Sequence, residues 1–215
     1  LFGETSILPS FVNSVLVAVM RALGELATAT LAGYAFATLP FRGRNTVFIA
    51  YLATSLIPAQ LLLVPRFVYF QQLGLYDTLW ALILPGMFTV LGTFLMRQYF
   101  VAQPREFAEA ARLDGAGEFR IFSRIYLPSA MPMISALAIL TFVWSWNDYE
   151  TPLVFLSDPE KYTLPLGLTS FVDETGAMAP GLSMAAAVLS ILPILLVFLV
   201  FQRRFVHAMT ESALK

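Results

Sequence analysis

Long apolar stretches separated by short polar segments are the dominant pattern along this sequence. A helix that crosses a lipid bilayer needs about 20 mostly apolar residues, and five stretches reach that length. None of the five shows the period-two alternation of apolar and polar positions that a membrane β-barrel requires. The pattern therefore predicts an all-α fold, a polytopic transmembrane helix bundle, with spans at about 11–39, 47–72, 78–100, 129–151 and 183–202.

The composition also favours lipid as the solvent. Of the 215 residues, 58% are hydrophobic and 13% are charged, against about 25% charged in a typical soluble domain. The 13 Lys and Arg residues nearly balance the 14 Asp and Glu residues, so no positive excess points to a nucleic-acid partner. The chain has no Cys and a single His, His207. We therefore expect no thiolate or His-based metal site, no Cys nucleophile and no His-based acid/base cluster.

Arginines gather on one side of the predicted membrane. The connections 40–45 and 101–128 and the tail from Arg203 are rich in Arg, whereas the opposite connections are mainly acidic, with Lys161 their only cation. The positive-inside rule places the Arg-rich connections in the cytoplasm. The chain would then begin outside and end in the cytoplasm. Because it starts with Leu1 and not Met, we expect a further span before it, which would make six.

The most informative connection is the cytoplasmic segment 104–128, PREFAEAARLDGAGEFRIFSRIYLP. Its first part is strongly helix-forming, and Asp114-Gly115 is expected to end that helix, since glycine adopts a positive φ easily. The segment could be an interfacial loop that touches lipid headgroups. A protein-docking role is favoured, because the segment is long for a bundle connection and Ala110 and Ala111 form a small, smooth spot.

A second short helix is expected after the bend. Its spacing predicts that Phe119, Phe122 and Tyr126 share one face, and that the helix ends before Pro128, since a proline disfavours helical backbone at the preceding residue. Two short amphipathic helices would then meet at a bend on the inner surface of the membrane.

The same segment resembles a known family. EAARLDGAGEFRIFSRIYLPSAMP is similar to the EAA loop of ATP-binding-cassette (ABC) importer permeases. TLAGYAFATLPFRGRN, FVWSWNDYETPLVFL and FQRRFVHAMTESALK resemble other segments of carbohydrate-uptake permeases, and the last resembles the ending of the maltose-type second permease subunit. The positions that match the EAA loop are Glu109, Ala110, Ala111, Asp114, Gly115, Ala116, Phe122, Leu127 and Pro128.

This resemblance implies a permease subunit of a type I, binding-protein-dependent ABC importer. It would lie in a bacterial or archaeal cytoplasmic membrane and form half of the pathway for a carbohydrate. The implied partners are a second permease subunit in a heterodimer, two ATPase subunits and an extracytoplasmic sugar-binding protein. The chain would bind no cofactor, and ATP and Mg²⁺ would belong to the ATPases. The residues expected to couple to the ATPase are Glu109, Ala110, Ala111, Asp114, Gly115, Phe119, Phe122 and Pro128.

Polar residues inside the spans are costly in lipid and are usually paired or functional. Arg21 and Glu25 stand four positions apart on the first span, which predicts an ion pair between them. The sequence suggests a substrate pathway at Gln60, Trp144, Asn147 and Asp148, although an aromatic belt at the membrane surface fits the tryptophan-rich segment equally well.

The outer loop 157–182 is polar and rich in Gly and Pro. It could be a plain connector. The resemblance suggests a protrusion that enters the sugar-binding protein, with Glu174, Gly176 and Pro180 at its tip.

Two other functions use the same residues. A secondary transporter or channel could use Arg21, Glu25 and Asp148 as a charge relay, but such a protein needs no elaborate cytoplasmic docking loop. An intramembrane enzyme fits least, since the sequence has no His pair, no Cys and no convincing nucleophile–base pair.

Overall fold

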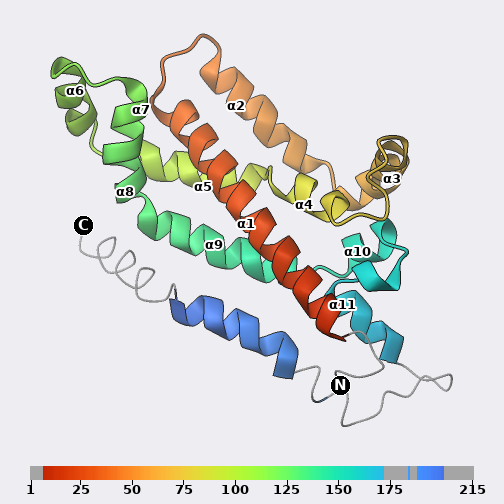
Figure 1. Cartoon of the computed structure of the whole chain (residues 1–215). Helices are drawn as coiled ribbons and strands as arrows, with labels where there is room; N and C mark the ends of the chain where they lie inside the picture. Colours follow the sequence, from red (N-terminus) through yellow and green to blue (C-terminus); the bar gives the residue numbers. More distant parts are fainter. Residues whose placement is uncertain (1–6, 172–183, 185–187, 201–215) are drawn as a thin grey trace. The chain divides into compact units, whose positions relative to one another are not determined.

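A computed structural model describes residues 7–171, 184 and 188–200 (Figure 1). Within these residues every regular element is a helix. The described residues divide into two compact units. The first unit comprises 7–23, 58–87, 139–171, 184 and 188–200, and the second comprises 24–57 and 88–138. Because α1 (Ile7–Thr38) and α9 (Met131–Trp146) are continuous helices, each contributes residues to both units.

The first unit contains the connections that the sequence predicts to lie outside the membrane. Two apolar cores hold it, one around Phe70, Leu82 and Phe155 and the other around Ala18 and Trp146. Besides its parts of α1 and α9, its elements are η2 (Ala59–Leu62), α3 (Leu63–Gln72), α4 (Trp80–Gly86), α10 (Glu150–Phe155), η4 (Pro159–Lys161), α11 (Leu164–Gly167), η5 (Leu168–Phe171) and the apolar helix Val188–Val200.

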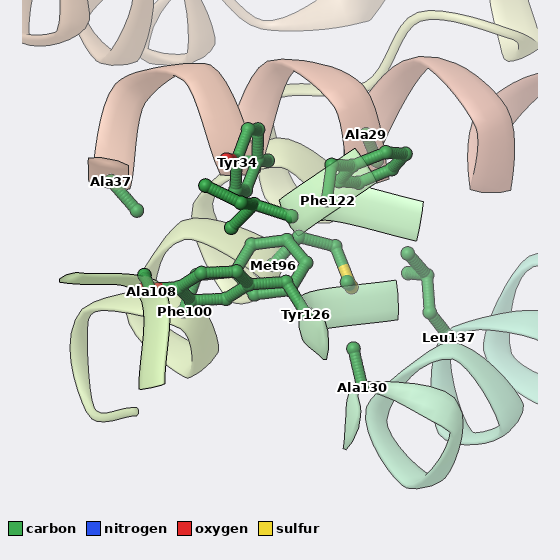
Figure 2. Close-up of a cluster of buried hydrophobic side chains, with 11 residues drawn as sticks. Ala29, Tyr34, Ala37, Met96, Phe100, Ala108, Phe122, Tyr126, Ala130 and Leu137 are labelled. Atoms are coloured by element: carbon green, nitrogen blue, oxygen red, sulfur yellow. The ribbon is translucent and has the colours of Figure 1, made fainter. Parts of the chain in front are cut away.

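The second unit contains the predicted cytoplasmic segment. A single apolar core, drawn in Figure 2, joins residues from α1, α5, α6, η3 and α9. Its other elements are α2 (Arg44–Ala53), η1 (Thr54–Leu56), α5 (Val90–Val101), α6 (Glu106–Leu113), α7 (Glu118–Ile121), the π-helical turn η3 (Phe122–Tyr126) and α8 (Leu127–Ser129).

Each predicted span contains apolar helix. Ile7–Thr38 and Trp80–Val101 are long and apolar enough to cross a bilayer, and two broken pairs satisfy the same test, Arg44–Leu56 with Ala59–Gln72 and Glu118–Ser129 with Met131–Trp146. The fifth, Val188–Val200, is shorter. The all-α fold is confirmed. The exact span limits and the additional span before Leu1 stay predictions.

A break divides the second predicted span at Ile57 and Pro58. Ile57 has an extended backbone with φ −81° and ψ 116°, as expected for a residue that precedes proline. Helical hydrogen bonding stops there because Pro58 has no N–H to donate. The break therefore lies where the proline requires it.

Gly33 allows α1 and α5 to touch inside the second unit. A Cβ built at Gly33 would lie 2.6 Å from Met96 Cβ and 2.8 Å from the backbone nitrogen of Arg97. Both distances are shorter than a normal contact, and the second involves backbone, which cannot move aside easily. Small residues permit such close helix contact in membrane bundles.

We predict that Gly33→Ala destabilises the second unit by about 1–3 kcal/mol, the usual cost of overpacking. The unfolding midpoint of the purified protein measures this loss. Gly117→Ala is the matched control, because a Cβ there meets no atom within 4 Å and φ is −71°. Equal midpoints for the two variants would contradict the close contact.

Asp77 ties two loops of the first unit together. One carboxylate oxygen accepts hydrogen bonds from the backbone N–H groups of Ser157 (2.9 Å) and Asp158 (3.0 Å), and the other accepts one from Lys161 Nζ at 2.7 Å. These donors, with the Lys161 ammonium first, lower the pKa of Asp77 to about 2. The Asp158 carboxylate also pairs with Lys161, at 3.3 Å.

This depressed pKa predicts an acid-sensitive contribution to stability. The Asp77 contribution is present above its ordinary pKa of about 3.9 and is lost as the pH falls towards 2, because the unfolded chain then binds the proton first. Thermal unfolding of the parent and Asp77→Asn should differ at pH 7 and converge below pH 3. A difference that persists unchanged at pH 2 would refute the assignment.

Candidate functional site

Residues 104–128, called the elbow from here on, form the site that the sequence singles out. Helix α6 ends in a Schellman motif, in which Gly115 donates to Arg112 O and Ala116 donates to Ala111 O, at 3.0 and 2.9 Å. Gly115 has φ +78°, the left-handed conformation that such an ending needs. The bend predicted at Asp114-Gly115 is therefore present, and its geometry is fixed by hydrogen bonds.

A series of side-chain hydrogen bonds connects the bend to α1. Arg112 on α6 binds Glu118 on α7 through two hydrogen bonds, of 2.7 and 3.2 Å. The hydroxyl of Tyr34 on α1 donates to the same Glu118 carboxylate at 2.9 Å. None of these three residues was predicted as part of the site. The sequence signal for the contact is Glu118 in the first turn of the second helix, where a carboxylate is favoured.

The inner side of the elbow is part of the second unit's core. Ala108 on α6, Ile121 on α7, and Phe122 and Tyr126 on η3 are all buried. The ring of Tyr34 lies 4.9 Å from Phe122 and 5.2 Å from Tyr126, centroid to centroid, as Figure 2 shows. Tyr34 thus joins the elbow to α1 through both its ring and its hydroxyl.

The contributions of these contacts to the free energy of folding differ in size. Arg112 and Glu118 have side chains that are 38% and 44% exposed, and such surface ion pairs contribute about 0–1 kcal/mol. Each large buried apolar side chain contributes about 1.5–3 kcal/mol. Apolar burial therefore supplies most of the free energy that holds the elbow on the bundle, and the ion pair links α6 to α7.

The structure corrects the predicted aromatic face. Phe122 and Tyr126 are 8% and 3% exposed, but Phe119 is 79% exposed. Ile121 is 0% exposed, so the buried face of this helix runs through Ile121 and Phe122 and leaves Phe119 outside it. Phe122 is therefore buried in the core of the second unit and Phe119 is exposed, and the coupling of either residue to an ATPase stays a prediction.

The sequence predicted that this helix ends before Pro128, and that prediction is wrong. The N–H of Leu127 donates to Phe122 O across the π-helical turn, and Pro128 then lies in the first turn of α8. Pro128 has no N–H, so one helical hydrogen bond is not formed at this position. The helical backbone nevertheless continues through Pro128 to Ser129.

The outer side of the elbow carries unusually exposed apolar side chains. Leu113 is 90% exposed, Phe119 is 79% exposed and Phe107 is 65% exposed. Leu113 and Phe107 were not among the predicted coupling residues. Of the predicted ones, Ala111 is half-buried, and those that are exposed are Glu109, Ala110, Asp114, Gly115, Phe119 and Pro128.

A second group of charged residues lies in the first unit. Arg21 Nη1 donates to Asp148 at 2.9 Å, and the Arg66 guanidinium lies 4.7 Å from the centre of the Phe155 ring. Asp148 also accepts a hydrogen bond from the backbone N–H of Thr151, at 3.1 Å. A side chain at Gly86 would collide with the Arg21 guanidinium, so the ion pair packs against α4.

Arg21 and Glu25, which were predicted to pair with each other, each contact another residue in the structure. The ion-pair partner of Arg21 in the first unit is Asp148, a residue that the sequence assigned to the substrate pathway. In the second unit, the Glu25 carboxylate accepts a hydrogen bond from the Thr89 hydroxyl. A direct bond between Arg21 and Glu25 stays a prediction.

The remaining pathway candidates differ in accessibility. Trp144 and Asn147 are exposed, whereas Trp146 is buried and donates from Nε1 to Ser190 O at 2.9 Å. Gln60 is exposed in η2. The tip residues Glu174, Gly176 and Pro180, and the tail with Arg203 and His207, lie outside the described residues.

Comparison with known proteins identifies relatives along nearly the whole chain. A family model described as "Binding-protein-dependent transport system inner membrane component" matches residues 29–211. The chain is 37% identical over 205 residues to the arabinooligosaccharides transport system permease protein AraQ of Halalkalibacterium halodurans, covering 95% of this chain and 73% of AraQ.

Two further relatives are permease proteins of transport systems named for other substrates. The maltodextrin transport system permease protein MdxG of Bacillus subtilis is 35% identical over 217 residues, covering 100% of this chain and 78% of MdxG. The sn-glycerol-3-phosphate transport system permease protein UgpE of Agrobacterium fabrum is 35% identical over 201 residues, covering 93% of this chain and 71% of UgpE.

A solved structure has the same fold. It is the crystal structure of a bacterial ABC transporter involved in the import of the acidic polysaccharide alginate. One of its chains matches with a TM-score of 0.82 and 26% sequence identity, covering 94% of this chain and 76% of that chain.

The bend geometry generates a prediction for the elbow. Gly115→Ala places a side chain in the left-handed region, which costs about 1–2 kcal/mol, and should speed hydrogen exchange of the 106–121 amides about tenfold. Gly117→Ala, with φ −71° and open space around it, should leave exchange unchanged. Equal exchange rates in the two variants would show that the Schellman ending does not hold the elbow.

Proposed function

Since this chain belongs to the family of binding-protein-dependent transport system inner membrane components, we propose that its elbow transmits the movement of a cytoplasmic ATPase to the membrane helices. The chain is a non-catalytic membrane permease subunit of an ABC importer, with the type I permease fold. The observation that carries the proposal is the two-sided elbow, buried on the bundle side and apolar on the exposed side.

The exposed side supports docking of another protein. Leu113, Phe119 and Phe107 all lie on α6, α7 or the junction between them. Large exposed apolar residues near polar ones mark protein interaction surfaces. Beside them, Glu109 and Asp114 add charge, and Ala110 lets a partner approach closely. We propose that these residues occupy a cleft of the ATPase.

The buried side supports transmission of force. Ala108, Ile121, Phe122 and Tyr126 belong to the same core as α1 and α5, and protein cores pack densely enough to transmit strain. The Arg112–Glu118–Tyr34 contacts prevent α6 from swinging separately from α1. Movement of the docked surface would therefore move the second unit as one body.

The rest of the transport system is part of the proposal. Two ATPase subunits would hold ATP and Mg²⁺, a second permease subunit would complete the pathway, and an extracytoplasmic binding protein would deliver the substrate. The arginine distribution supports a cytoplasmic elbow and C-terminus and an outer face at residues 73–77 and 156–161. Such transport systems belong to bacterial or archaeal cytoplasmic membranes.

For the substrate, we propose a carbohydrate, either an oligosaccharide or a sugar derivative. This follows the printed names of AraQ, MdxG and UgpE and the alginate importer. Exposed Trp144 and Asn147 suit contact with a sugar, since an aromatic ring packs on its apolar face and an amide bonds its hydroxyls. Gln60 and Asp148 remain further pathway proposals, with Asp148 held by Arg21.

The docking surface can be tested by charge insertion. Leu113→Asp and Phe119→Asp should each reduce co-purification with the ATPase and ATP-driven uptake at least tenfold, because a buried carboxylate without a partner is costly. Phe41→Asp is the matched control, since Phe41 is 43% exposed on the same predicted side but lies outside the elbow.

Two further measurements are needed, one for folding and one for the substrate class. Unchanged unfolding midpoints show that the three variants fold, and uptake of labelled maltodextrin, arabinooligosaccharide and glycerol-3-phosphate by the reconstituted complex tests the substrate class. Uptake by this chain alone, driven by an ion gradient, would overturn the proposal in favour of a secondary transporter.

A further inference from the structure

A partly open cavity of about 120 Å³ lies against the elbow, inside the second unit. The end of α1, the start of α2, the end of α5, α6 and η3 all contribute to its wall. A water molecule occupies about 30 Å³ in the liquid, so the cavity has room for a group the size of one phosphate. Its lining includes Arg44, Arg105, Arg112, Glu109, Thr38 and Tyr126.

The charges around this cavity do not balance. Three arginines and one glutamate line it. Arg112 is bound to Glu118, but the recorded hydrogen bonds of Arg44 go to neutral backbone oxygens, those of Ala37 (3.3 Å) and Leu39 (3.4 Å). For Arg105, no ion pair or hydrogen bond of the side chain is recorded within the described residues. Two guanidinium groups therefore have no carboxylate partner among these residues.

Neutral donors extend the same wall. The Tyr126 side chain is 3% exposed and lines the cavity with the basic groups, and no hydrogen bond of its hydroxyl is recorded within the part of the chain that the structure describes. Guanidinium and hydroxyl groups together are the donors that phosphate oxygens prefer. The Glu109 carboxylate in the wall disfavours an anion, but it is outnumbered.

We propose that this cavity binds one phosphoryl group and that the bound group ties the elbow to α2. The guanidinium of Arg44 comes from the start of α2, and those of Arg105 and Arg112 flank α6. A phosphate between them would bridge α2 and α6. Its source is either an anionic phospholipid headgroup, since basic pockets beside membrane helices bind such headgroups, or free phosphate.

Arg105→Gln is the informative variant. Arg105 is exposed, so its replacement should leave the fold intact, and the unfolding midpoint verifies this. Arg124→Gln is the matched control, because Arg124 is an exposed arginine of the same elbow that does not line the cavity.

The full chain, purified in its transporter complex, is placed in nanodiscs and given two probes. Equilibrium dialysis with labelled inorganic phosphate in phosphatidylcholine nanodiscs tests the free anion. Native mass spectrometry after exchange into phosphatidylglycerol-containing nanodiscs tests retained lipid. Arg105→Gln should weaken at least one of these at least fivefold, and Arg124→Gln should weaken neither.

The binding results distinguish the two sources of phosphate and can disprove the proposed site. Binding of inorganic phosphate alone identifies the free anion, and retention of phosphatidylglycerol alone identifies the headgroup; both support the cavity. If the parent protein binds neither probe, or if the two variants lose binding equally, the proposal is wrong. Binding is measured without transport, so this result is independent of the proposed import function.

Discussion

The burial of Tyr34 among the aromatic rings of η3 and α5 is the contact on which the elbow depends. Its ring packs on Phe122, Tyr126 and Phe100, and its hydroxyl bonds Glu118. The ring contacts supply most of the free energy, because apolar burial outweighs an exposed ion pair. The hydroxyl adds direction, since a hydrogen bond to a carboxylate is satisfied over a narrow range of geometry.

This arrangement gives the elbow two faces with opposite requirements. The bundle side needs a continuous core, and small residues such as Ala108 and Gly33 let the helices approach closely enough to form it. The other side leaves Leu113 and Phe119 in solvent, which is unfavourable for a free protein and favourable once a partner covers them. A lever between two proteins needs both conditions at once.

Charge is handled differently in the two units. In the first unit, Arg21 and Asp148 neutralise each other and Arg66 rests on an aromatic ring, so the charges are compensated by contacts from distant parts of the sequence. In the second unit, arginines of α2 and α6 surround a cavity with too few carboxylates. Compensated charge stabilises a fold, whereas uncompensated charge is available to a ligand.

The sequence by itself determined the features that depend on local chemistry. The apolar stretches predicted the helices because a helix in lipid must satisfy its own backbone groups. Asp114-Gly115 predicted the bend because glycine adopts a positive φ easily. The motif around Glu109 identified the elbow and, through it, the family.

Only the tertiary structure decided which distant residues meet. Tyr34 and Glu118 are 84 positions apart, and Arg21 and Asp148 are 127 apart, so no local pattern could pair them. Helical spacing placed Phe119 with Phe122, but the structure buries Phe122 beside Ile121 and leaves Phe119 exposed. Side-chain burial depends on what packs against a helix, and a single helix sequence does not contain that information.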